Sequence, residues 1–166
     1  SEVCKKYKLP LMVDNAHGAY LGFLKKSMHP IALGADMCCD SAHKTLPALT
    51  GAAYLHISKN APSEFVKNAR TELSVFSSTS PSYLILQSLD LLNKYLSESF
   101  SEEIESCAKK VRILKKRLSE KGYDILNNEP IKITVNVSSA GMTGFELAEL
   151  IRSSKIEPEY SDREYL

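Results

Sequence analysis

Two charged residues, Asp14 and Lys44, follow short apolar segments of the kind that form strands. Asp14 comes directly after residues 9–13, an apolar run typical of a strand buried in a parallel sheet. A carboxylate at the end of a buried strand is costly unless a cation or strong donors meet it, so a bound group is one explanation for Asp14. The alternative is that Asp14 caps the following turn or the N-terminus of a helix.

Lys44 lies among small and polar residues in the segment SAHKTLPALT, beyond a predicted strand over residues 35–39. Taken alone, Lys44 is equally compatible with a surface loop. In open parallel sheets, however, ligands bind outside the carboxyl ends of the strands, where both Asp14 and Lys44 are expected. Pyridoxal phosphate requires two such groups, an amine that forms a Schiff base and a carboxylate that keeps the ring nitrogen protonated.

Three segments occur in order along the first hundred residues: VDNAHGAYLGF (13–23), SAHKTLPALTGAAYLH (41–56) and SSTSPSYLILQSLD (77–90). Together they resemble the Orn/Lys/Arg decarboxylase family of pyridoxal-phosphate enzymes, which has the fold type of aspartate aminotransferase. The resemblance covers most of residues 1–100, and residues 101–166 resemble the following region of the family more weakly.

The resemblance implies a role for each matching residue. Lys44 corresponds to the lysine that forms the aldimine, and Asp14 to the partner of the pyridinium nitrogen. His17 occupies the place of a donor to the phenolic oxygen of the cofactor, and Ala16 would pack beneath the ring. Lys44, Asp14 and His17 are therefore the predicted catalytic residues, although His17 could instead order its own loop.

Four further residues are predicted cofactor ligands through the same resemblance. Ser41 and His43 correspond to residues around the phosphate or the aldimine, with the alternative that His43 only orients Lys44. Ser78 and Thr79 correspond to residues that contact the phosphate across a dimer interface, and their segment could also form the N-cap of the next helix.

The implied activity is decarboxylation of a basic amino acid, lysine, ornithine or arginine, by a cytoplasmic homodimer or higher oligomer. Enzymes of this family are several times longer and carry a phosphate-cupping loop and a ring-stacking aromatic upstream, which are not found before Asp14. We therefore expect this chain to be an internal piece that is inactive alone. The alternatives are another pyridoxal-phosphate activity, such as transamination or a different lyase, and a non-catalytic fragment.

Composition excludes several other classes of protein. The 166 residues include 21 basic and 20 acidic side chains, which give a formal net charge of +1. That charge balance does not favour nucleic acid as a partner, and no apolar run approaches the ~20 residues that cross a bilayer. The four cysteines lack C-x-x-C spacing and are interpreted as reduced thiols, and no His, Cys and carboxylate residues have zinc-ligand spacing.

The predicted elements define an α/β fold. We expect residues 1–98 to be the C-terminal part of a cofactor-binding large domain, and residues 99–166 to begin a smaller α+β domain. The helix over residues 82–96 is apolar around most of its circumference, which predicts burial on several sides in a complete enzyme and an exposed, self-associating patch in this piece. Further strands are predicted over residues 51–57 and 131–137. Helices are predicted to begin at Pro62 and Ser101, and the lysines of the second helix are expected on a solvated face. Thr143 and Glu146 form a predicted capping box.

Overall fold

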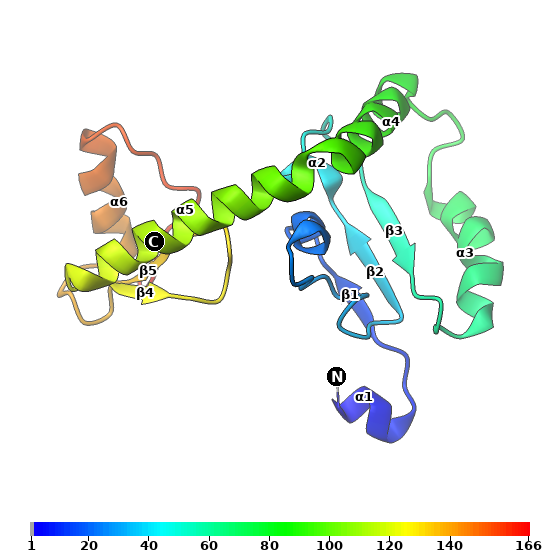
Figure 1. Ribbon diagram of the computed structural model, residues 1–166, viewed down its shortest axis with the longest axis horizontal. Helices are drawn as coiled ribbons and strands as arrows, with labels where there is room; N and C mark the ends of the chain where they lie inside the picture. The colour runs from blue at the N-terminus through cyan, green and yellow to red at the C-terminus, as the bar shows by residue number, and fades with distance from the viewer. Residues whose placement is uncertain (1) are drawn as a thin grey trace. The chain divides into compact units, whose positions relative to one another are not determined.

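The structure is a computed structural model that describes residues 2–166 (Figure 1). The chain divides into two compact units, Ser1–Glu105 and Ser106–Leu166. None of the described helices is long and apolar enough to cross a lipid bilayer. The boundary expected after residue 98 concerns the domains of a longer enzyme and stays a prediction.

The first unit contains a three-stranded sheet in the order β1-β2-β3. Strands β1 and β2 are parallel and pair Asp14 with Cys39, whereas β3 is antiparallel to β2. The carboxyl ends of β1 and β2 therefore meet at one edge of the sheet, as the sequence predicts for the segments that carry Asp14 and Lys44. The strand bounds are β1 (Met12–Asp14), β2 (Met37–Asp40) and β3 (Tyr54–Ile57).

Helical segments precede, connect and follow the strands of this sheet. The segment that holds Lys44 is a short helix, because residues 42–45 form one turn between β2 and β3, so the alternative of a surface loop is wrong. The core of the unit includes Tyr20, Cys38, Ala42 and Ala52, all almost fully buried. The helical elements are α1 (Glu2–Tyr7), η1 (Ala19–Phe23), α2 (Ala42–Thr45), α3 (Ser63–Phe76) and α4 (Tyr83–Glu98).

The prediction of burial is wrong for β1. Strand β1 is not buried: Met12 is 63% exposed, and Asp14 and Cys39, which share its face by alternation and register, are exposed too. Helix α4 buries Leu92 but leaves Leu84 68% exposed, so it packs on one side only, in agreement with the exposed apolar patch that we expect for this helix. Both elements have the apolar composition of buried segments, but in the described residues no packing layer covers these faces.

The second unit is built on α5 (Phe100–Glu120), within which the unit boundary falls, and on α6 (Gly144–Ser153). Strands β4 (Asp124–Leu126) and β5 (Thr134–Asn136) form an antiparallel pair. The sequence predicts β5, although longer, and does not predict β4. The C-terminal segment lies along β5, where Val135 and Leu166 exchange backbone hydrogen bonds of 2.7 and 3.0 Å.

Local polar contacts in this unit confirm one sequence prediction and correct another. The capping box is present, since the Thr143 hydroxyl accepts from the Glu146 amide and the Glu146 side chain accepts from the Thr143 amide. Lys115 is not on the solvated face of α5 but is 6% exposed, and its Nζ donates to the carbonyls of Leu126 and Glu129. Burial lowers the pKa of Lys115, and the nearby Glu129 opposes that shift.

Candidate cofactor site

Asp14 is the last residue of β1, and the backbone continues the parallel ladder one step beyond it. The amide of Asn15 donates to the carbonyl of Cys39 at 2.9 Å. The sequence predicts that Asp14 is buried and therefore needs a cationic partner. Asp14 is exposed instead, so burial does not create that need. The buried carboxylate at this edge is Asp40, the last residue of β2, which is 2% exposed.

Lys44 lies four residues after Asp40, on a turn that is held on several sides. Ala42 and Leu46 are buried beneath the turn, and the amide of Leu46 donates to the carbonyl of Ala42. The ring of His43 donates from Nδ1 to the carbonyl of Ala52 at 3.0 Å, because a carbonyl can only accept. The Lys44 side chain itself is exposed, on a turn whose backbone is held by these contacts.

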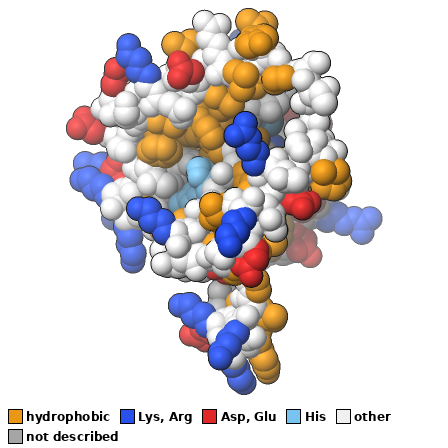
Figure 2. Space-filling model, turned by 90° about the vertical axis from the view of Figure 1, so that its right-hand side faces the viewer, with side chains coloured by type: hydrophobic (Ala, Val, Ile, Leu, Met, Phe, Trp, Pro, Cys, Tyr) orange, Lys and Arg blue, Asp and Glu red, His pale blue; other side chains and the backbone are white. Residues whose placement is uncertain are grey.

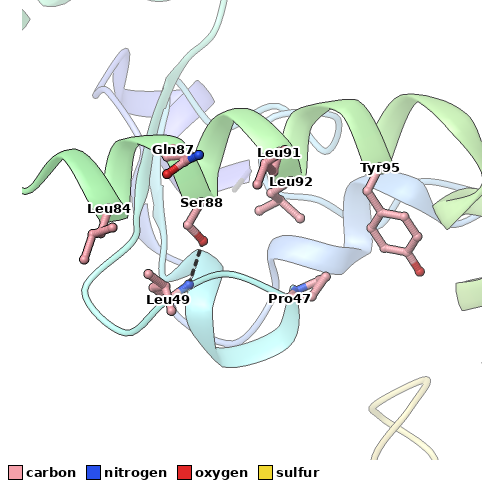
Figure 3. Close-up of a pocket in the computed structure, with 8 residues that line it drawn as sticks. All are labelled: Pro47, Leu49, Leu84, Gln87, Ser88, Leu91, Leu92 and Tyr95. Carbon is pink, nitrogen blue, oxygen red and sulfur yellow. Dashed lines mark hydrogen bonds between the residues drawn. The ribbon is translucent and has the colours of Figure 1, made fainter.

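The loop that follows α2 is anchored to α4. The amide of Leu49 donates to the hydroxyl of Ser88 at 2.9 Å (Figure 3). A pocket of about 430 Å³ lies between this loop and α4, and leucine is the residue type that recurs in its walls. The position of α2 therefore depends on α4 as well as on the sheet.

The other predicted residues fall into two groups. Ala16 and His17 follow Asp14 in the loop after β1, and Ser41 begins the turn that carries Lys44, so these residues belong to the same edge of the sheet. Ser78 and Thr79, by contrast, lie in the exposed loop between α3 and α4.

That loop makes no polar contact with the strand ends. Within residues 2–166, no hydrogen bond or ion pair joins Ser78 or Thr79 to them, and the Ser78 hydroxyl accepts only from the amide of Ser80. The N-cap position of α4 is Ser82, so the alternative role of Ser78 and Thr79 as an N-cap is wrong.

Asp14 and Lys44 share one further property. In the part of the chain that the structure describes, neither side chain forms a hydrogen bond or an ion pair. Both groups are exposed and lie on segments that leave the same edge of the sheet. An amine and a carboxylate are thus available there to a ligand.

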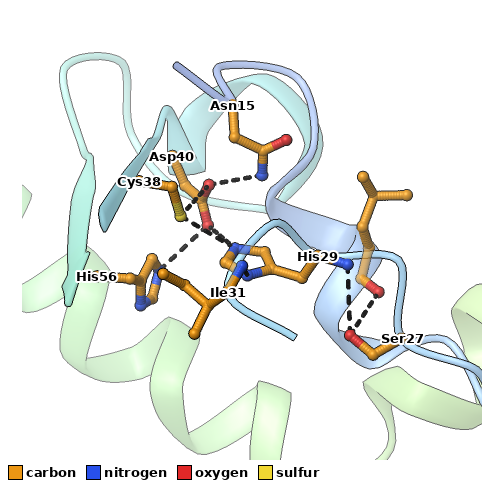
Figure 4. A network of polar contacts seen from close by, with 8 residues as sticks. Asn15, Ser27, His29, Ile31, Cys38, Asp40 and His56 are labelled. Carbon is orange, nitrogen blue, oxygen red and sulfur yellow. Dashed lines mark hydrogen bonds and ion pairs between the residues drawn. The ribbon is translucent and has the colours of Figure 1, made fainter. Parts of the chain in front are cut away.

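A polar network around Asp40 lies behind this edge and was not predicted from the sequence. Asp40 Oδ2 is 2.9 Å from His29 Nε2 and 3.1 Å from His56 Nε2, and Asp40 Oδ1 accepts from Asn15 Nδ2 at 2.7 Å (Figure 4). The Cys38 thiol lies 3.9 Å from Oδ1. These four partners satisfy a carboxylate whose burial would otherwise be costly.

The surroundings of His29 fix its tautomer. The amide of Ile31 donates to His29 Nδ1 at 3.3 Å, so Nδ1 accepts and the proton of the neutral ring is on Nε2, facing Asp40. His29, Asp40 and His56 lie close enough together to hold a metal ion. A metal on His29 Nε2 would move that proton to Nδ1, against the Ile31 amide, so the contacts favour a hydrogen-bonded network.

A cavity of about 600 Å³ opens over the network. Residues of η1, of β3 and of α4 line it, and His29, Asp40 and His56 are among its polar residues. The surface view shows apolar side chains gathered around a hollow in which histidine is visible (Figure 2). The network is therefore close to solvent although Asp40 itself is buried.

The hydrogen bonds dominate the ionisation of Asp40. Burial acts to raise the pKa of Asp40, but hydrogen bonds from His56, His29 and Asn15 outweigh burial and lower the pKa to about 2. Burial and the Asp40 charge raise the pKa of the Cys38 thiol to about 12, so this thiol stays protonated.

The lowered pKa of Asp40 predicts an acid-dependent loss of stability. Ionised Asp40 stabilises the fold at pH values above its ordinary pKa of 3.8, and this contribution is lost as the pH falls through about 2. We expect about 2 kcal/mol in the free energy of unfolding. Denaturant unfolding of the wild type and of Asp40→Asn, from neutral to acidic pH, measures the contribution as the difference between the two curves. Curves that stay parallel would show that folding does not lower the pKa of Asp40.

Comparison with known proteins assigns the family. Residues 1–135 match the family described as Orn/Lys/Arg decarboxylase, major domain. This match covers most of the chain, and the chain therefore belongs to the Orn/Lys/Arg decarboxylase family. The family assignment confirms the resemblance carried by the three sequence segments.

Individual relatives agree with this assignment. The chain is 31% identical to the uncharacterized protein YaaO of Bacillus subtilis, over 94% of this chain and 34% of that protein. It is 30% identical to the arginine decarboxylase of the same organism, over 97% of this chain and 35% of that enzyme. The chain thus spans about a third of the length of these curated relatives.

A solved structure with the same fold is the lysine decarboxylase LdcF of Francisella novicida. The TM-score is 0.70 at 20% sequence identity, and the match covers 94% of this chain and 29% of the other. This similarity confirms the predicted fold class, a mixed α/β arrangement.

Proposed function

We propose that this chain provides the lysine and the ring-nitrogen partner of a pyridoxal-phosphate site in a decarboxylase of a basic amino acid. The observation that carries the proposal is the exposed, unengaged pair Asp14 and Lys44 at the carboxyl ends of adjacent parallel strands. Membership of the Orn/Lys/Arg decarboxylase family supports the same chemistry.

The side chains of Lys44 and Asp14 fit this cofactor. Its carbonyl carbon needs a primary amine, which Lys44 offers on an anchored turn, and its ring nitrogen needs a carboxylate, which Asp14 offers at the neighbouring strand end. When bound, pyridoxal phosphate supplies an electron-withdrawing ring that accepts the electron pair left by a departing carboxylate.

The residues of this chain would bind the cofactor, orient it and exchange protons with it. The Lys44 amine would hold the cofactor covalently and, when free, would carry a proton. The Asp14 carboxylate would keep a proton on the ring nitrogen, and His17 would donate to the phenolic oxygen. Ala16 would pack against the ring, and the base of the site would be fixed by the turn that His43 anchors to Ala52.

The phosphate ligands and the oligomeric state belong to the same proposal. Ser41 would contact the phosphate from the strand end, and Ser78 and Thr79 would contact it from the partner subunit of a homodimer. The exposed position of the loop between α3 and α4 supports contacts outside its own subunit. We also propose that the protein acts in the cytoplasm, without nucleic acid or membrane as a partner.

The reaction is tested by carbon dioxide release. The complete protein that contains this chain, loaded with pyridoxal phosphate, is incubated separately with carboxyl-labelled arginine, lysine and ornithine. We expect labelled carbon dioxide from at least one of them and none from norleucine, which lacks the distal cation. Cofactor binding with formation of a keto acid and no release of carbon dioxide would contradict decarboxylation and indicate transamination.

A further inference from the structure

One partly buried side-chain contact joins the two segments that carry Asp14 and Lys44. Asn15 directly follows Asp14, and Asp40 lies at the end of β2, four residues before Lys44. Asn15 Nδ2 donates to Asp40 Oδ1 at 2.7 Å (Figure 4). The parallel ladder ends with the Asn15 amide on the Cys39 carbonyl, so this side-chain contact continues the pairing past the last strand residues.

The carboxylate at the centre of this contact is itself immobilised. His29 reaches Asp40 from the connection between η1 and β2, and His56 reaches it from β3. A third donor, Asn15, comes from the loop after β1. Asp40 itself is 2% exposed, so its carboxylate oxygens are shielded from water.

We propose that Asp40 is a positioning residue that, through Asn15, holds the Asp14 loop against the base of the Lys44 turn. This inference rests on the proposed function, because it assigns the contact a purpose at the cofactor site. An amine and a carboxylate that bind one rigid ring must keep a fixed separation before the ring arrives. The Asn15–Asp40 contact supplies that constraint from behind, without touching the cofactor.

The chemistry of the contact requires an acceptor on both oxygens of residue 40. Asn15 Nδ2 can only donate, and His29 Nε2 also donates because its Nδ1 accepts from the Ile31 amide. A carboxylate accepts on both sides. An amide at this position would turn an NH₂ group toward one of the donors, which explains why the carboxylate is needed here.

Two variants separate positioning from general stability, because each removes one donor from the same carboxylate. Asn15→Ala removes the link between the two segments and leaves both histidines in place. His56→Ala is the matched control, since it removes a donor from β3 and leaves the link intact. Gly18→Ala is a second test of the link, because an added Cβ would lie 2.0 Å from Asn15 Oδ1 and must displace that side chain.

Amide hydrogen exchange of the cofactor-free complete protein is the first readout. We expect Asn15→Ala and Gly18→Ala to speed exchange in both residues 15–23 and residues 41–52, where backbone hydrogen bonds now protect the amides. His56→Ala should leave these two segments close to the wild type. Equal effects in Asn15→Ala and His56→Ala, or no effect on residues 41–52, would overturn the positioning role.

Cofactor titration is the second readout. The dissociation constant for pyridoxal phosphate should rise about ten-fold or more in Asn15→Ala and change little in His56→Ala. The circular dichroism band of the bound cofactor should weaken in Asn15→Ala, because the ring is less firmly oriented. A wild type that binds no pyridoxal phosphate would overturn the proposed function and the purpose of the contact. Wild-type binding with unchanged affinity in Asn15→Ala would overturn the positioning role alone.

Discussion

Replacing Lys44 by alanine is expected to lower the rate of decarboxylation by several orders of magnitude. Lys44 is the one primary amine on the anchored turn after β2, so no other group there can hold the cofactor covalently. The measurement is kcat of the complete protein at saturating pyridoxal phosphate and substrate, for the wild type and for Lys44→Ala.

Two further variants make this test specific. Lys44→Arg keeps the positive charge but lacks a nucleophilic amine, so it should be as inactive as Lys44→Ala. Lys59→Ala, in the turn after β3, should retain wild-type kcat because that lysine lies outside the proposed site. Substantial activity in Lys44→Ala, or loss of activity in Lys59→Ala, would place the anchor elsewhere.

Asp14→Asn should separate cofactor binding from chemistry. The substitution keeps the size of the side chain and removes the charge that would hold a proton on the ring nitrogen. We therefore expect pyridoxal phosphate to remain bound while the chemical step slows by orders of magnitude. Single-turnover rates at saturating cofactor measure this step, and Asp90→Asn, on the exposed surface of α4, is the control that should keep the wild-type rate.

The same experiment tests the alternative role of Asp14 as a cap. In a cap, a nearby backbone amide would donate a hydrogen bond to the Asp14 carboxylate, and among the described residues the Asp14 side chain accepts none. Near-normal turnover in Asp14→Asn, with the cofactor bound, would show that Asp14 takes no part in the chemical step.

Local sequence patterns were sufficient to predict most elements and the edge where the proposed site lies. Short apolar runs predict β1, β2 and β3, and the capping box predicts the start of α6, because these signals depend on neighbouring residues. The placement of Asp14 and Lys44 follows from the same runs, since each residue comes just beyond one of them.

Burial and long-range contacts could not be predicted in the same way. The composition of β1 is that of a buried strand, but coverage depends on elements elsewhere in the fold, so Asp14 is exposed and Asp40 is buried. Two partners of Asp40, His29 and His56, come from a loop and from another strand, 11 and 16 positions away, and only the folded chain brings them together. The one local signal was a carboxylate at the end of β2, next to the segment that carries Lys44.

Borohydride reduction of the complete protein loaded with pyridoxal phosphate, followed by peptide mapping, tests the central claim most directly. Reduction makes the attachment permanent, so the mass of the pyridoxyl group identifies the lysine that holds the cofactor. The account predicts this mass on the peptide that contains Lys44. A pyridoxyl group on Lys59 or Lys67 instead, with Lys44 unmodified, would contradict it.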